Sequence, residues 1–245
     1  MKEFITDESI LQVLRGYNKW WETGRVPDEF AKPVKRLAYY EAKQSFEHRM
    51  IRRHVILTGA RRVGKSTIMY QTIQDLLNAG VQPKNVLYAS FDHPLLKVSE
   101  IDRILKVYIN NIALDEELYL FLDEVQYAQD WNGWLKTIYD SRPTFRVMAT
   151  GSASPAFSEK MPESGVGRWV QIRIPTLSFY EFLEIRGVDM PRIDENIGPT
   201  DLSKWTRKEL AGFMRSLQPL ERYFHRYLLI GGFPEIAQTD DISYA

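Results

Sequence analysis

Short runs of apolar residues alternate with amphipathic stretches through the middle of the chain. Four runs are apolar at nearly every position, namely residues 55–59, 86–91, 118–122 and 145–150. Such runs are typical of strands that are buried on both faces, as in a parallel sheet covered by helices. Residues 169–174 alternate apolar and polar positions, as an edge strand does. The pattern predicts an α/β fold with an open sheet of about five strands.

Helical stripes separate these strands. Apolar residues recur every three or four positions over residues 69–77, 101–112 and 131–138. Ser99 and Asp102 have capping-box spacing and predict the start of the second helix. Strand and helix therefore alternate along the core.

Helical patterns also flank the core. Trp20 and Trp21 belong to an amino-terminal helical element, where we expect core or interface residues rather than platforms for nucleic-acid bases. Ser178 and Thr206 each stand three residues before a glutamate, which predicts two further capped helices. Polar residues 188–204 predict a linker. We therefore expect three parts: a helical element over residues 1–50, the sheet core over 51–187 and a small helical subdomain over 188–245.

Composition narrows the class of protein. The 245 residues include 32 Lys plus Arg and 32 Asp plus Glu, so the formal net charge is zero. This balance excludes a polycation and gives no general case for binding nucleic acid or a membrane. The absence of cysteine and the scatter of four histidines exclude a disulfide framework and a Cys or His metal cluster. No apolar run approaches about 18 residues and no signal-peptide core opens the chain, so we expect a cytoplasmic protein with no membrane partner.

One motif carries strong candidate chemistry. Residues 59–66 match the phosphate-binding loop pattern G-x-x-x-x-G-K-[ST] at every fixed position. The loop follows an apolar strand and opens a helix, which favours a phosphate cradle over a glycine-rich turn with a surface lysine. Lys65 is predicted to face solvent until it binds the β and γ phosphates, and Ser66 to ligate Mg²⁺. The residues predicted to contact the nucleotide are Gly59, Ala60, Arg61, Arg62, Val63, Gly64, Lys65, Ser66 and Thr67.

An acidic pair ends the strand at residues 118–122. Asp123 is predicted to hold Mg²⁺, usually through water, and Glu124 to polarise the attacking water as general base. The alternative is a surface Asp-Glu pair after an ordinary strand. The pairing favours hydrolysis over phosphoryl transfer to a second substrate, and the absence of an Asn-Lys-x-Asp guanine signature favours ATP.

A small polar side chain is predicted beside the γ-phosphate. In P-loop folds with such an acid pair, an extra strand lies between the loop strand and the acid strand. The carboxyl end of that strand directs a small polar side chain at the γ-phosphate, and this contact can sense whether the γ-phosphate is present. Ser152 is favoured for this sensor role and Thr150 is the alternative. A simple helix cap near Ser154 is also open.

Five segments occur in a characteristic order and spacing: ILTGARRVGKST, LYLFLDEVQ, ATGSAS, GRWVQIRIPTLSFYEFL and YLLIGGFPE. Together they resemble the archaeal and bacterial AAA-type P-loop ATPases near the STAND and AAA+ branches, over nearly the whole chain. The resemblance implies ATP or ADP with Mg²⁺, a core strand order of 5-1-4-3-2 and a helical lid after the sheet. It also implies that Pro234 packs near the adenine, although a helix cap followed by a helix-stopping proline explains this segment too.

The resemblance implies partners as well. Arg168 precedes the edge strand, where AAA+ relatives keep an arginine that reaches a neighbouring subunit's nucleotide, which would require a homo-oligomer. A contact in cis and a merely solvated arginine are the alternatives. Relatives usually continue past GGFPE into an effector-like region, whereas this chain ends ten residues after Glu235, so a truncated chain and a short family member are both open.

The expected function is Mg²⁺-dependent ATP hydrolysis that drives a conformational switch acting on a protein partner or effector domain. Two alternatives stay open: a nucleotide-binding module without turnover, and a DNA-processing motor. Residues 32–53 hold seven Lys or Arg against Glu41 and Glu47, a patch that could contact nucleic acid. Such a cluster is more often a solvated helix face.

Overall fold

The chain divides into two units after Pro175. A computed structural model describes residues 5–48, 50–152, 167–190 and 198–239. The units are Met1–Pro175 and Thr176–Ala245. We expected the helical subdomain, the last of three parts, to begin at residue 188. The division falls earlier because helix α9 (Phe179–Ile185) packs against helices that follow it in the chain.

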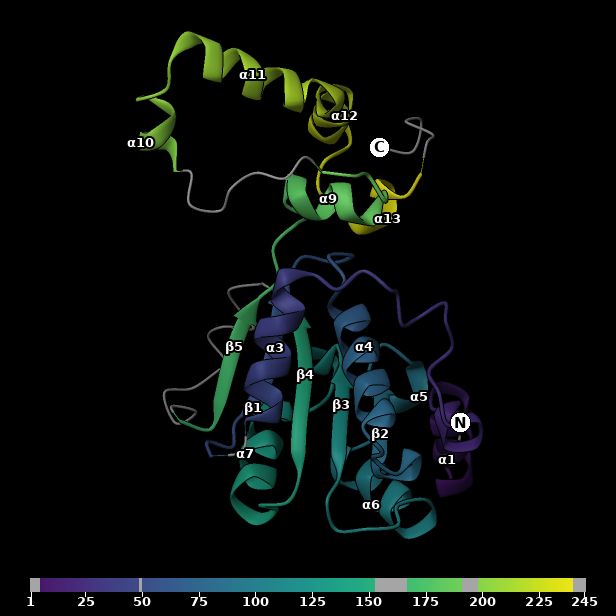
Figure 1. Ribbon diagram of the computed structural model, residues 1–245. Coiled ribbons are helices and arrows are strands. Elements are labelled where there is room, and N and C mark those ends of the chain that lie inside the picture. The colour runs from purple at the N-terminus through teal and green to yellow at the C-terminus, as the bar shows by residue number, and fades with distance from the viewer. Residues whose placement is uncertain (1–4, 49, 153–166, 191–197, 240–245) are drawn as a thin grey trace. The chain divides into compact units, whose positions relative to one another are not determined.

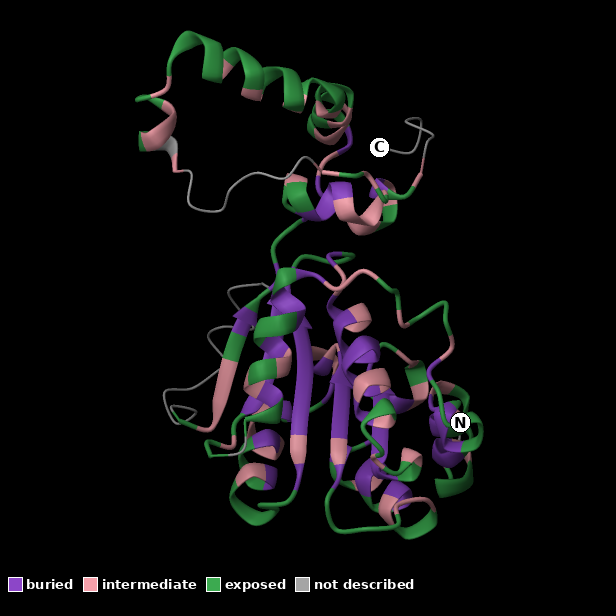
Figure 2. Cartoon of the chain, viewed as in Figure 1, coloured by how far each residue is buried: buried purple, intermediate pink, exposed green. Residues whose placement is uncertain are grey.

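A five-stranded parallel sheet forms the centre of the first unit (Figure 1). Its strands are β1 (His54–Gly59), β2 (Val86–Ser90), β3 (Tyr119–Asp123), β4 (Arg146–Ser152) and β5 (Trp169–Arg173). They lie in the order β2-β3-β4-β1-β5, and each neighbouring pair is parallel. This confirms the α/β class and the expected order 5-1-4-3-2. Every residue of β1 and β2 is buried, as the apolar runs predict, and Figure 2 shows this burial along the central strands.

Helices cover both faces of this sheet. Those described in the first unit are α1 (Asp7–Tyr17), α2 (Trp20–Thr23), α3 (Leu37–Glu47), α4 (Lys65–Asn78), α5 (Pro94–Lys97), α6 (Ile101–Asn111) and α7 (Trp131–Ser141), with 3-10 turns at Pro83–Asn85 and Val125–Tyr127. Helices α3 and α4 pack on one face, and α6 and α7 on the other (Figure 1). Right-handed crossovers between parallel strands require α4 to lie on the face opposite to α6 and α7, because the chain reverses direction across the sheet at β2.

The start of α6 differs from the expected capping box. Glu100 occupies the N-cap position, and no side chain caps the helix there. Ser99 Oγ instead donates to the carbonyl of Leu95, at 2.8 Å. The prediction was wrong because the short helix α5 ends immediately upstream and its carbonyl takes the serine hydroxyl.

The amino-terminal helical element belongs to the first unit and covers the edge strand β2. Trp20 and Trp21 are buried, which confirms their placement in the core, and both indole Nε1 atoms donate to the carbonyl of Val86, at 3.0 and 2.8 Å. Asn18 pairs with the backbone of Tyr88, donating to its carbonyl at 2.8 Å and accepting from its N–H at 2.6 Å. These contacts occupy backbone groups that an edge strand otherwise leaves open.

The second unit is a small helical assembly. Its described helices are α9, α10 (Pro199–Leu202), α11 (Arg207–Leu217), α12 (Glu221–Ile230) and α13 (Pro234–Ala237), with a 3-10 turn at Gln218–Leu220. The capping boxes expected at Ser178 and Thr206 are both present. Buried side chains of its core include Leu177, Phe182, Leu183, Ile230 and Ala237. Part of the expected linker, residues 191–197, lies outside the described residues.

Gly232 allows a close approach within this unit. Leu177 N–H donates to the carbonyl of Gly232 at 2.6 Å, and a Cβ on Gly232 would stand 2.7 Å from the Leu177 carbonyl oxygen. A larger residue would therefore force the two segments apart. Within the described ranges of the whole chain, no helix combines the length and the apolar character needed to cross a bilayer.

Candidate functional site

The phosphate loop joins the carboxyl end of β1 to the start of α4. Gly64, the N-cap residue, has φ 95°, a left-handed conformation that glycine adopts without steric cost. Arg62 also has a positive φ of 64°. Ala60, Arg61 and Arg62 are exposed and Val63 is buried. The sharp bend at the helix start leaves the loop N–H groups and the helix amino terminus at the surface, where an anion can reach them.

Lys65 folds back over this loop. Its side chain is 4% exposed, and its Nζ donates to the carbonyls of Gly59 at 3.2 Å and Ala60 at 2.9 Å. The expectation that Lys65 faces solvent was therefore wrong, because the loop carbonyls satisfy the ammonium group. Burial lowers the Lys65 pKa, and the carboxylates of Glu124, 4.0 Å away, and Asp123 oppose that shift. The positive charge of the Lys65 ammonium group thus lies between the phosphate loop and the acidic pair Asp123 and Glu124.

Asp123 is held at the end of β3 by hydroxyl groups. Its Oδ2 accepts from Ser66 Oγ at 2.7 Å and from the Tyr88 hydroxyl at 2.7 Å, and its Oδ1 accepts from Thr150 Oγ1. The Asp123 side chain is buried, and burial raises the Tyr88 pKa well above its usual value, so this phenol is a donor at neutral pH. The direct contact of Ser66 and Asp123 brings together a hydroxyl and a carboxylate oxygen, the donor set that fits Mg²⁺.

Glu124 follows Asp123 in a left-handed backbone conformation, with φ 53° and ψ 45°. Its N–H donates to Thr150 Oγ1 at 2.8 Å, and its carboxylate accepts from Gln126 Nε2. A non-glycine residue in this region costs on the order of 1 kcal/mol, and such strain concentrates at functional sites. The turn directs the Glu124 carboxylate toward Lys65.

Strand β4 lies between the loop strand and the acid strand, as expected for the sensor. Thr150 is fully buried and its hydroxyl contacts both acidic residues, Asp123 through its side chain and Glu124 through its backbone. Ser152 stands opposite Gly59 at the end of β4, and its side chain lies outside the described residues. Thr150 therefore contacts the acidic pair, and the choice between Thr150 and Ser152 as the γ-phosphate sensor stays a prediction.

Arg168 is not brought to this site. Its carbonyl accepts from His54 N–H at the amino end of β1, whereas the loop begins after Gly59 at the carboxyl end. At about 3.3 Å per residue the strand separates these ends by about 16 Å. The structure therefore does not support the cis alternative, because Arg168 lies at the end of β1 opposite to the loop. The Arg168 guanidinium pairs with Asp140, Nε to Oδ1 at 3.0 Å.

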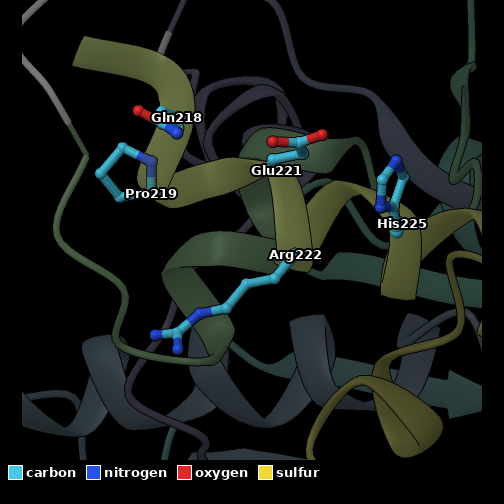
Figure 3. Close-up of a pocket in the computed structure, with 5 residues that line it drawn as sticks. All are labelled: Gln218, Pro219, Glu221, Arg222 and His225. Atoms are coloured by element: carbon cyan, nitrogen blue, oxygen red, sulfur yellow. The ribbon is translucent and has the colours of Figure 1, made fainter. Parts of the chain in front are cut away.

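Pro234 and a surface pocket both belong to the second unit. Pro234 is the first residue of α13. Gly231 is the C-cap residue of α12, which agrees with the alternative explanation of this segment as a helix cap. Figure 3 shows the pocket, which is lined by Gln218, Pro219, Glu221, Arg222 and His225. The Arg222 side chain extends away from Glu221 and His225, so these side chains do not converge on one ligand position.

The basic residues 32–53 are largely engaged inside the first unit. Lys35 and Lys43 bind the carboxylate of Asp75 on α4, at 2.8 and 2.6 Å. Arg52 donates to the carbonyl of Arg142 at 3.2 Å and lies over the Tyr139 ring. These contacts weaken the case for a nucleic-acid surface.

Three residues that contact the acidic pair or the phosphate loop belong to no motif predicted from the sequence. Tyr88 and Gln126 contact the acidic pair, and the buried Arg36 donates to the carbonyls of Val63 in the loop at 2.7 Å and of Pro175 at 3.0 Å. Arg36 thus connects the basic segment over residues 32–53 to the phosphate loop. Tyr88 lies within an apolar run and Arg36 lies 27 residues before Val63, so spacing gives no signal for these two residues. Gln126 is only two residues from Glu124, but a lone glutamine after an acidic pair matches no motif.

Comparisons with known proteins identify the family of this chain. Residues 51–183 match the family model described as "AAA domain". The chain therefore belongs to the AAA domain family, and its core is a nucleotide-binding module of the ATPase type. The expected resemblance is confirmed.

Three curated relatives are uncharacterized proteins. One, from Haemophilus influenzae, is 26% identical over 192 residues, covering 76% of this chain and 40% of the relative. Two from Methanocaldococcus jannaschii, MJ1544 and MJ1637, are 26% and 28% identical and cover 76% and 77% of this chain. The chain spans less than half the length of these relatives, with 36% of MJ1544 and 39% of MJ1637. The Aeropyrum pernix ORC1 protein, solved in complex with DNA, aligns over 69% of this chain and 53% of its own, with a TM-score of 0.44 and 14% identity.

Proposed function

We propose that this chain binds ATP with Mg²⁺ and hydrolyses it to ADP and phosphate. The observation that carries the proposal is the contact of Ser66 with Asp123 beside the buried Lys65. A phosphate loop alone serves binding. A hydroxyl and a carboxylate that meet next to the loop lysine also provide for a cation on the phosphates.

The residues have separate tasks in this reaction. The loop N–H groups and the Lys65 ammonium hold the β and γ phosphates, while Ser66 and Asp123 hold Mg²⁺, Asp123 through water. When bound, Mg²⁺ neutralises charge on the phosphate oxygens. Glu124 accepts a proton from the water that attacks the γ phosphorus, the bond from that phosphorus to the bridging oxygen breaks, and ADP leaves. Arg61, Arg62 and Thr67 stay predicted nucleotide contacts, as does Pro234 at the adenine.

Hydrolysis is proposed to operate a switch. Nucleotide states would differ in how the helical lid meets the sheet unit, and a protein partner or effector domain would read that difference. In the curated relatives, of which this chain spans 36–40%, the remaining sequence is long enough to contain such an effector domain. In a homo-oligomer, Arg168 of one subunit would act on the nucleotide of its neighbour.

ATP turnover by the purified chain tests the proposal. We expect phosphate release in Mg²⁺, none in EDTA, and none from Lys65→Ala, which should also fail to bind ATP at micromolar concentration while its circular dichroism stays unchanged. Glu124→Gln should bind ATP yet lose about two to four orders of magnitude in rate. Tight Mg²⁺-dependent binding without turnover by wild type would identify the non-hydrolysing module instead. Stimulation by added DNA would identify the motor.

A further inference from the structure

Tyr88 connects the edge strand β2 to the acidic end of β3. It lies opposite Phe121 in the register of the two strands, two residues before Asp123 along β3. Its hydroxyl nevertheless reaches Asp123 Oδ2 at 2.7 Å, and the residue is 4% exposed. A buried phenol that donates to a carboxylate makes a charge-assisted bond, the stronger kind of protein hydrogen bond.

The Tyr88 donor shares its acceptor with Ser66, whose Oγ also donates to Oδ2 at 2.7 Å. Ser66 has a second proposed task, because its hydroxyl oxygen is a candidate cation ligand. Tyr88 has none, so its bond to Oδ2 can persist whatever Ser66 binds. With Thr150 on Oδ1, Tyr88 then fixes the plane of the carboxylate from both oxygens.

Tyr88 is itself fixed from two directions. Its ring stacks on Tyr70 of α4 with centroids 4.7 Å apart, and Tyr17 of α1 meets it edge-on at 5.8 Å. Its backbone N–H and carbonyl both bond to the side chain of Asn18, which follows α1. The position of the hydroxyl is therefore set by the helix that follows the phosphate loop and by the amino-terminal element.

We propose that Tyr88 is a positioning residue for Asp123: its hydroxyl holds the carboxylate in the orientation that receives the Mg²⁺ shell. The inference rests on the proposed function, since it assigns Asp123 to the cation. Residues that orient a metal ligand typically change metal affinity by about 10- to 100-fold when they are removed. The effect expected at Tyr88 is at the lower end, because Thr150 still holds the other oxygen.

Tyr88→Phe tests the hydroxyl alone, since phenylalanine keeps both ring contacts. Tyr108→Phe is the matched control: Tyr108 is fully buried, and its hydroxyl donates at 2.7 Å to the carbonyl of Lys84, away from the acidic pair. The measurement is the affinity for a fluorescent ATP analogue titrated with Mg²⁺, and again in EDTA. We expect Tyr88→Phe to raise the Mg²⁺ concentration for half-maximal tightening about tenfold, with binding in EDTA unchanged. Tyr108→Phe should match wild type in both titrations.

The outcomes separate the two proposals. A Tyr88→Phe titration that superimposes on wild type overturns the positioning role and leaves the proposed function untouched. Equal increases of the half-maximal Mg²⁺ concentration in Tyr88→Phe and Tyr108→Phe also overturn the positioning role, because the loss of any buried hydroxyl would then have the same effect. Absence of Mg²⁺-dependent binding by wild type overturns the assignment of Asp123 itself. Thermal unfolding of each variant in EDTA confirms that folded protein is compared, and Mn²⁺ in place of Mg²⁺ should reduce the Tyr88→Phe defect, because Mn²⁺ accepts less regular ligand geometry.

Discussion

Replacing Thr150 with valine removes one hydroxyl and preserves the shape of a fully buried side chain. Two bonds are lost together, the donation to Asp123 Oδ1 and the acceptance from Glu124 N–H at 2.8 Å. A hydrogen bond to a charged group contributes about 1.5–3 kcal/mol, and a buried N–H without a partner costs about 1–3 kcal/mol. Because the two losses share one atom they do not add fully, and we expect a decrease of about 3 kcal/mol in the free energy of unfolding.

Turnover should decrease as well. The Thr150 bond holds Glu124 N–H in its left-handed turn, and without it the turn can relax and carry the carboxylate away from the loop. We expect a decrease of about 10- to 100-fold in kcat, below the full effect of losing a general base. Urea denaturation and phosphate release at saturating Mg²⁺ and ATP measure the two quantities.

Thr72→Val is the matched control. Thr72 is also fully buried, but its hydroxyl donates at 2.8 Å to the carbonyl of Ile68 in its own helix, so its loss should cost no more than about 1 kcal/mol. The reasoning is refuted if Thr150→Val unfolds and turns over ATP like this control. If Ser152→Ala alone lost turnover, the sensor would be Ser152 as the sequence first favoured.

Three further predictions concern the cation, the subunit contact and the fold. Asp123→Ala should weaken nucleotide binding in Mg²⁺ and leave it unchanged in EDTA; equal affinity with wild type in Mg²⁺ would contradict the ligand role. If Arg168 acts on a neighbouring subunit, specific activity should rise with protein concentration, and mixing Arg168→Ala with Lys65→Ala should restore turnover; constant activity and no rescue would reject this. Burial disfavours the Asp75 carboxylate, but hydrogen bonds from two lysines and a tyrosine outweigh it and lower its pKa from 3.8 to about 2. The resulting stabilisation of about 2 kcal/mol is complete above pH 3.8 and disappears as pH falls through 2. Asp75→Asn should therefore be less stable than wild type by about that amount at pH 7 and equally stable in acid. Urea denaturation at pH 7 and in acid measures the two differences.

The sequence predicted the parts of this molecule that local patterns control. The five strands follow from apolar runs, and the phosphate loop with its following helix from one contiguous motif. The proximity of Asp123 to Ser66 follows from parallel strands, whose carboxyl ends share one edge of the sheet. The strand order came from the family resemblance, since apolar runs do not say which strand lies beside which.

The remainder depends on long-range geometry. The Tyr88 contact requires the register of β2 against β3 and a side-chain rotamer, neither of which an apolar run records. Lys65 was expected in solvent because the folding of its ammonium group onto the loop carbonyls is not visible in a motif. Ser99 was assigned as a cap because its competing acceptor lies in α5, a helix too short to leave a period.

The covering of β2 by the amino-terminal element has a consequence for handling the protein. The carbonyl of Val86 accepts from two indoles, and the backbone of Tyr88 pairs with the Asn18 amide. Few backbone groups of β2 are therefore left for the strand of another chain to pair with. A fragment that begins at the phosphate-loop strand would keep the whole motif and yet uncover this edge and the apolar surface beneath Trp20 and Trp21. Exposed strand edges recruit further strands, so such a fragment should precipitate or form intermolecular sheets. We therefore expect that the shortest soluble piece containing the phosphate loop begins upstream of Asp7, far ahead of the loop itself.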